Sequence, residues 1–181
     1  RSAQLAKLWD LHRQTLDAGW GSFVCMTGET GVGKTRLLTQ LKNAVAESGG
    51  AGWYQGQTPQ ASGHWLGAIR EVLISIFGIQ TDGQHNISER IAATMKRWSS
   101  GQDADAARLV DLLTESSELS AEPPSFSDTK ATELDMADQE LLFGTIERAL
   151  RRTAAKHPLV IALEDLHWAG SPTRALIEYL V

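Results

Sequence analysis

The chain has 181 residues, of which 42% are hydrophobic and 22% charged, as is typical of a globular protein. Its net charge of −5 gives no general electrostatic attraction to nucleic acid or to an anionic membrane. No apolar run approaches the roughly 18–20 residues of a membrane-spanning helix, and a single cysteine excludes an intramolecular disulfide. Because the chain begins at Arg1 rather than at Met, we interpret it as part of a longer, cytoplasmic protein.

The N-terminal part alternates between helix-like and strand-like patterns. Apolar residues recur every three or four positions over 3–18, which predicts a helix. FVCMT at 23–27 predicts a short buried strand, in which Cys25 is expected to be a small buried hydrophobe. A glycine-rich loop follows, and regularly spaced leucines predict a helix over 33–47. GWYQG at 52–56 is interpreted as a second short strand.

The middle of the chain has a helical pattern. Residues 65–77 predict a strongly amphipathic helix, and two more helices are expected around 87–98 and 109–113. Between 116 and 135 there are few large apolar residues, and Ser, Glu, Asp and a Pro-Pro pair predict a surface loop. We interpret 59–135 as a helical insert between the second and third predicted strands, with packing as its default role.

The last part returns to a strand between helices. A long helix is predicted over 136–155 with Leu141 on its inner face, and LVIAL at 159–163 predicts a buried strand. Ser171 is the expected N-cap of a final helix, and Pro172 its first residue. Alternating strands and helices predict an α/β fold with a parallel sheet covered on both faces.

The loop after the first predicted strand reads GETGVGKT, which fits the pattern G-x-x-x-x-G-K-S/T of a phosphate-binding loop. Its glycines permit positive φ angles and a close approach of the backbone to an anion. Lys34 is expected to reach the β and γ phosphates of a nucleotide, and Thr35 to offer its hydroxyl to Mg²⁺. The candidate nucleotide-binding residues are Gly28, Glu29, Thr30, Gly31, Val32, Gly33, Lys34, Thr35 and Arg36.

Two adjacent acids end the third predicted strand. In phosphate-loop proteins an acid at such a strand end holds Mg²⁺, and we assign this role to Glu164. Asp165 is the candidate general base for the attacking water, although the two roles are interchangeable on sequence alone. Lys34 completes the candidate catalytic set. We expect Trp168 to be an apolar anchor beneath the loop, while His167 either senses the γ-phosphate or is a packing residue.

These motifs resemble those of the STAND-type signalling ATPases, which belong to the AAA+-like phosphate-loop class. The resemblance rests on GETGVGKTRLL, on GWYQGQTPQASGHWLGAIREVL and on LVIALEDLHWAGSPTRALIEYL, and extends over nearly the whole chain. Arg1 looks like a remnant of the family's adenine-side motif, whereas Gly170 stands where the family commonly has Asp. The resemblance implies a three-layer P-loop NTPase fold whose sensor strand separates the loop strand from the acid strand. No such strand is found before Val181, so we expect an incomplete sheet.

The resemblance also implies a function. We expect 1–181 to be a partial ATPase domain, made of 1–58, the insert 59–135, and 136–181. It is expected to bind ATP or ADP with Mg²⁺, to hydrolyse ATP slowly, and to act as a switch for effector domains in the same or a partner polypeptide. A nucleotide-dependent homo-oligomer is one expected assembly. The alternatives are a scaffold that binds nucleotide without hydrolysis, a DNA-associated initiator ATPase, and a small-molecule kinase in which the loop strand and the acid strand are direct neighbours.

Overall fold

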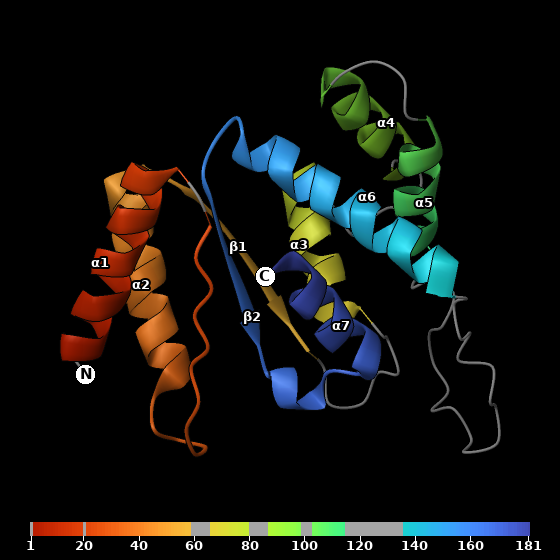
Figure 1. The fold of residues 1–181 in the computed structure, drawn as a ribbon. Coiled ribbons are helices and arrows are strands. Elements are labelled where there is room, and N and C mark those ends of the chain that lie inside the picture. Colours follow the sequence, from red (N-terminus) through yellow and green to blue (C-terminus); the bar gives the residue numbers. More distant parts are fainter. Residues whose placement is uncertain (1, 20, 59–65, 80–86, 99–102, 115–135) are drawn as a thin grey trace, which may run out of the picture.

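The computed structural model describes residues 2–19, 21–58, 66–79, 87–98, 103–114 and 136–181 (Figure 1). The first part holds helices α1 (Ser2–Ala18) and α2 (Lys34–Ser48), strand β1 (Gly52–Gln57) and helix α3 (Gly67–Phe77). Then come α4 (Ile87–Trp98), α5 (Asp103–Thr114), α6 (Met136–Ala154), strand β2 (Leu159–Glu164), a 3₁₀ turn at Leu166–Trp168 and α7 (Ser171–Leu180). The predicted loop at 116–135 lies outside the described residues.

Strands β1 and β2 form a parallel sheet, which confirms the second strand and its parallel pairing. The register pairs Gly52 with Leu159 and Gln57 with Glu164. One further backbone bond, from Thr58 N–H to the Glu164 carbonyl at 3.1 Å, extends the ladder past its end. The carboxyl ends of both strands therefore lie side by side.

The sheet has a hydrophobic cluster on each face, because paired residues of parallel strands point to the same side. Trp53 and Val160 contact a small cluster formed by α1 and α2, in which Val45 is fully buried. Leu163 contacts a larger cluster to which α3, α4, α5, α6 and α7 contribute. The arrangement confirms a three-layer α/β fold, with α1 and α2 on one side of the sheet and the remaining helices on the other (Figure 1).

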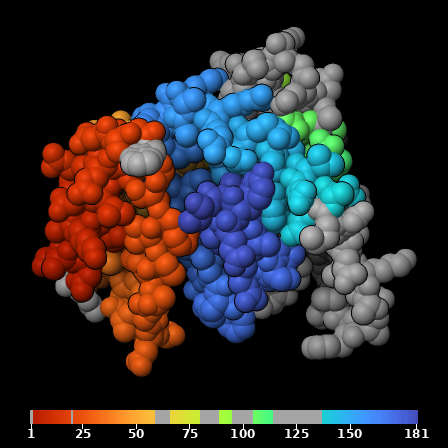
Figure 2. Space-filling view, viewed as in Figure 1, coloured from red at the N-terminus to blue at the C-terminus, as the bar shows by residue number. Residues whose placement is uncertain are grey.

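Helix α3 packs on β1 at very short range. A Cβ atom at Gly56 would lie 1.9 Å from the carbonyl oxygen of Ala68 in the first turn of α3. Only glycine leaves room for this approach, and the contact fixes the position of α3 against the sheet. Helices α6 and α7 pack next to each other on the face seen in Figure 2.

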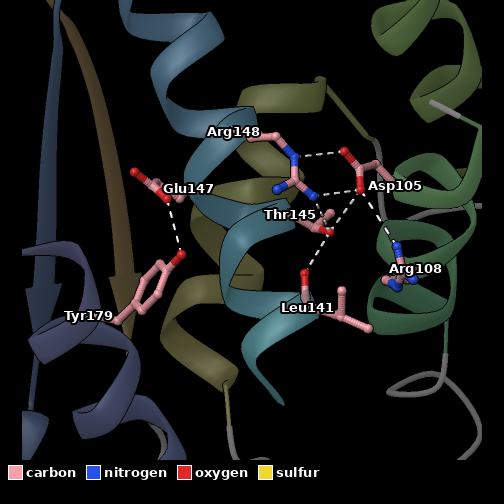
Figure 3. Close-up of polar contacts among 7 residues, drawn as sticks. All are labelled: Asp105, Arg108, Leu141, Thr145, Glu147, Arg148 and Tyr179. Atoms are coloured by element: carbon pink, nitrogen blue, oxygen red, sulfur yellow. Dashed lines mark hydrogen bonds and ion pairs between the residues drawn. The ribbon is translucent and has the colours of Figure 1, made fainter. Parts of the chain in front are cut away.

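Polar contacts join α5 to α6 and α6 to α7 (Figure 3). Asp105 of α5 is buried and accepts two hydrogen bonds from Arg148 of α6, at 2.9 and 2.7 Å, and a third from Thr145 at 3.0 Å. The Arg148 hydrogen bond, more than any other cause, holds the pKa of the Asp105 carboxyl below its usual range. Tyr179 of α7 donates to Glu147 of α6 at 3.2 Å. These contacts link α5, α6 and α7.

The prediction of a buried strand at 23–27 is wrong. Residues 21–29 have no regular secondary structure, Phe23 and Val24 are 56% and 46% exposed, and Cys25 is exposed rather than buried. A strand needs a partner for its backbone groups, and the partner of β2 is β1. In the described residues the sheet therefore has two strands, β1 and β2, and residues 23–27 are not part of it.

Two smaller predictions are also corrected. Leu141 is 47% exposed, because the buried face of α6 follows Leu142, Phe143 and Ile146. The N-cap of α7 is Gly170 rather than Ser171, because the helix begins one residue earlier than predicted. No described helix has the length and apolar character that crossing a membrane demands.

Candidate functional site

The glycine loop has the backbone conformation that its sequence predicts. Gly28, Gly31 and Gly33 have φ angles of 155°, 84° and 93°, a region that side chains with a Cβ rarely enter. Gly33 is the left-handed N-cap of α2, and no side chain caps this helix. The first N–H groups of α2 therefore lie beside the loop without a side-chain acceptor, which is the arrangement that binds anions at helix N-termini.

Lys34 folds back over this loop. Its ammonium donates to the carbonyl of Gly28 at 2.7 Å and to that of Glu29 at 2.9 Å. The loop therefore holds the Lys34 ammonium, which is the group expected to bind the nucleotide phosphates.

The loop and the acid strand meet at one hydrogen bond. The hydroxyl of Thr35, in the first turn of α2, donates to Oε2 of Glu164 at 3.0 Å, although the two residues are 129 positions apart. Glu164 is the last residue of β2, and the parallel sheet places its side chain on the same face as that of Trp53, the face covered by α2. The fold therefore brings together the two residues that the sequence predicts as magnesium ligands.

Two glutamines of β1 also contact the acids, and sequence reasoning missed both. Gln55 donates to Oε1 of Glu164 at 2.5 Å, and Gln57 donates to Oδ2 of Asp165 at 2.9 Å. The signal available in the sequence was the alternation Trp-x-Gln-x-Gln in 53–57, which places both amides on one face of the strand. Each acid thus has its own amide donor.

Asp165 has an unusual backbone. Its φ of 56° makes it the one non-glycine residue with a positive φ in the described part of the chain. Asp tolerates this conformation better than most residues, yet the conformation remains costly. It turns the chain sharply after β2, so that Asp165 is exposed beside Glu164 and its carboxylate meets Gln57.

The class of this site follows from the family of the chain. The family model described as "AAA ATPase domain" matches residues 1–181, the full length of the chain. The chain belongs to the AAA ATPase domain family. The comparison with curated proteins and the comparison with solved structures give no match. Membership indicates nucleotide binding and hydrolysis for this AAA ATPase domain, typically with Mg²⁺.

The residues of this AAA ATPase domain fit a magnesium ion. The described residues contain no group of three or more His, Cys, Asp or Glu side chains that would form a closed metal site. Mg²⁺ typically keeps several waters and takes one or two protein oxygens together with substrate phosphates. The Thr35 hydroxyl and the Glu164 carboxylate, 3.0 Å apart beside the phosphate loop, supply that kind of oxygen set.

A small cavity of about 190 Å³ lies next to the loop of the AAA ATPase domain. It is bounded by α1, by the segment that leads into Gly28, and by the first turn of α2. Its lining is almost entirely apolar and consists of Gln4, Lys7, Leu8, Leu11, Val24, Met26 and Leu37.

The remaining predicted residues lie on the surface. Glu29, Thr30, Val32 and Arg36 are exposed around the loop. Trp168 is 47% exposed, so its prediction as an apolar anchor beneath the loop is wrong. The ring of His167 is exposed and lies against that of Trp168, with centroids 4.9 Å apart. The 3₁₀ turn that carries both residues directs them outward, because it follows the left-handed Asp165.

Proposed function

We propose that this AAA ATPase domain binds Mg-ATP, hydrolyses it slowly, and acts as a nucleotide switch for effector domains in the same or a partner polypeptide. The observation that carries the proposal is the hydrogen bond between Thr35 and Glu164, which unites the phosphate loop and the acid strand in one site. A switch of this kind holds one conformation while ATP is bound and releases it on hydrolysis or exchange.

The two acids have different surroundings, which supports a division of labour. Glu164 shares a hydrogen bond with Thr35, so we assign it to the metal side. Asp165 is the neighbouring exposed carboxylate, and we assign it to the attacking water. We expect Asp165→Asn to lower ATP turnover at least tenfold while ATP binding is kept, as measured by phosphate release and by a binding assay. Turnover unchanged in this variant would contradict the assignment.

The cavity beside the loop is the proposed place of the adenine base. Val24 and Met26 lie just before the loop and Leu37 just after it, so the lining continues directly from the phosphate site. Its apolar walls suit the faces of a base.

The experiment that tests nucleotide binding is thermal unfolding with and without Mg-ATP. ATP at 100 times its dissociation constant is expected to add about 2.7 kcal/mol of stability. Lys34→Ala should remove most of this gain, whereas Lys42→Ala, an exposed lysine on the same helix, should keep it. If the wild-type protein gains no stability from Mg-ATP, the proposed function is wrong.

A scaffold that binds nucleotide without turnover is the second candidate. It is favoured by one observation: both acids already carry an amide donor, Gln55 on Glu164 and Gln57 on Asp165. An amide that already donates to a carboxylate oxygen occupies one of the lone pairs that an attacking water would use. Steady-state phosphate release measured alongside the binding assay separates the two candidates, because only the switch turns over.

A further inference from the structure

We propose that Gln55 is a positioning residue for Glu164, and that it sets the magnesium requirement of the nucleotide site. The inference rests on the proposed function, since it concerns the metal side of that site. It assigns a role to a strand residue outside both sequence motifs.

The carboxylate of Glu164 is held from two sides. Gln55 donates to Oε1 at 2.5 Å from β1, and Thr35 donates to Oε2 at 3.0 Å from α2. A carboxylate on a free side chain rotates about its last bonds, whereas one donor on each oxygen fixes its plane. The Gln55 side chain therefore determines which edge of the Glu164 carboxylate faces the loop.

Gln55 is itself held in one orientation. The indole Nε1–H of Trp53 donates to Oε1 of Gln55 at 3.1 Å, while the amide nitrogen of Gln55 donates to Glu164. A flipped amide would place its NH₂ against the indole N–H and its oxygen against the carboxylate, so that both bonds would be lost. Trp53 packs in turn on the hydrophobic cluster of α1 and α2. A chain of contacts thus connects this core to the acid.

The chemistry of the donor suits a metal-side role. A Gln amide is neutral, so it orients the carboxylate without cancelling the negative charge that attracts a divalent cation. Each carboxylate oxygen has two lone pairs, so one donor on each leaves others for a metal or its waters. A Lys or Arg in the same place would form an ion pair and compete with the cation. Residues that support metal ligands in this way typically change metal affinity about 10–100-fold when they are mutated.

Gln57 provides the contrast. It stands two residues further along the same face of β1, and its amide contacts Asp165 instead of Glu164. Its backbone N–H is held by Glu71 of α3 at 2.8 Å. The two glutamines therefore have similar places in the strand but contact different acids. An effect that comes only from losing a glutamine of β1 is expected in the variants of both residues.

The test measures the Mg²⁺ concentration that gives half of the ATP-dependent thermal stabilisation, in the 181-residue chain at a fixed ATP concentration. Gln55→Met keeps the length of the side chain and removes the hydrogen bond, and we expect it to raise this concentration about tenfold. Gln57→Met should change it less than threefold. The stabilisation by ATP in excess EDTA should be the same in wild type and Gln55→Met, because the phosphate loop is intact.

A second variant keeps the test decisive if Gln55→Met does not fold. Trp53→Phe removes the indole donor and lets the Gln55 amide rotate, so it should raise the half-stabilising Mg²⁺ concentration about threefold. An unchanged Mg²⁺ requirement in Gln55→Met, or in Trp53→Phe where the first variant is unfolded, overturns the positioning role while the proposed function stands. A wild-type chain that is not stabilised by Mg-ATP overturns both.

Discussion

Replacing Gly56 by alanine should destabilise the whole domain through a single methyl group. The new Cβ would lie 1.9 Å from the carbonyl oxygen of Ala68, 2.7 Å from its carbonyl carbon and 3.0 Å from its Cα. All three are backbone atoms at the start of α3, so no side-chain rotation relieves the clash. Strand β1 and helix α3 must separate by about 1.5 Å to restore an ordinary contact.

The magnitude follows from what α3 packs against. Ile69, Val72 and Leu73 of this helix are almost completely buried, and each loses close contacts when the helix moves away. Overpacking of this kind costs about 1–3 kcal/mol and occasionally more, and the rigid backbone partner places this site at the upper end. A loss of about 3 kcal/mol corresponds to a fall in Tm of roughly 6–12 °C for a chain of this size.

The assay is urea and thermal unfolding followed by circular dichroism, with Gly21→Ala as the matched control. A Cβ at Gly21 meets no atom within 4 Å, so this variant should be unchanged or slightly more stable, by up to about 1 kcal/mol. A Gly56→Ala protein whose unfolding free energy lies within about 0.5 kcal/mol of the wild type would refute the reasoning. It would mean that α3 does not rest on β1 at this point.

Two further predictions concern the polar contacts of Asp105 and the exposed cysteine. Asp105→Asn should lower the free energy of unfolding at pH 7 by about 2 kcal/mol, because it breaks charge-assisted hydrogen bonds. Since the folded-state pKa of Asp105 is depressed, its contribution to stability is present above the unfolded pKa of about 3.9 and is lost as the pH falls through the folded value. Urea unfolding of both proteins from pH 7 to pH 3 should therefore show a shrinking difference in unfolding free energy, and a constant difference would contradict the prediction. Cys25 is exposed and should react with a thiol reagent in the native protein at a rate similar to that of an unfolded control, whereas more than tenfold protection would contradict the exposed segment.

The helices were predictable because their signal is local. Apolar residues that recur at helical spacing define a buried face whatever the partner is, so the prediction of 33–47 matches Lys34–Ser48 and that of 136–155 matches Met136–Ala154. The periodicity does not show how much of the helix surface other elements cover. Leu141 belongs to the apolar pattern of its helix but lies at the edge of the interface, and is exposed.

The failure of the strand predicted at 23–27 could not be foreseen from its own residues. Phe23 and Val24 have the composition of a buried strand, but burial depends on a neighbouring strand that the pattern cannot supply. The expectation for Cys25 failed with it, because it assumed a buried strand. GWYQG was a weaker pattern and formed a strand, since β2 is available to pair with it.

One part of the candidate site was predictable from the sequence, and another part was not. The spacing of residues within each motif encodes the loop and the adjacent acids, and the fold brings Thr35 to Glu164. The contact of Gln55 with Glu164 joins residues 109 positions apart and follows from the strand register, which no local pattern records. The same limit applies to Asp105, an acid whose partner Arg148 lies on another helix 43 positions away.

The hydrogen bonds of Lys34 to the loop carbonyls change how its substitution by alanine should be interpreted. An ammonium has three N–H donors, and the carbonyls of Gly28 and Glu29 already occupy two of them, so an incoming phosphate that takes more than one donor must displace a carbonyl. The alanine variant loses the contact with the phosphate, but it has no such bonds to break. The measured loss of affinity is then smaller than the strength of the lysine–phosphate contact, because the free protein already uses the same donor.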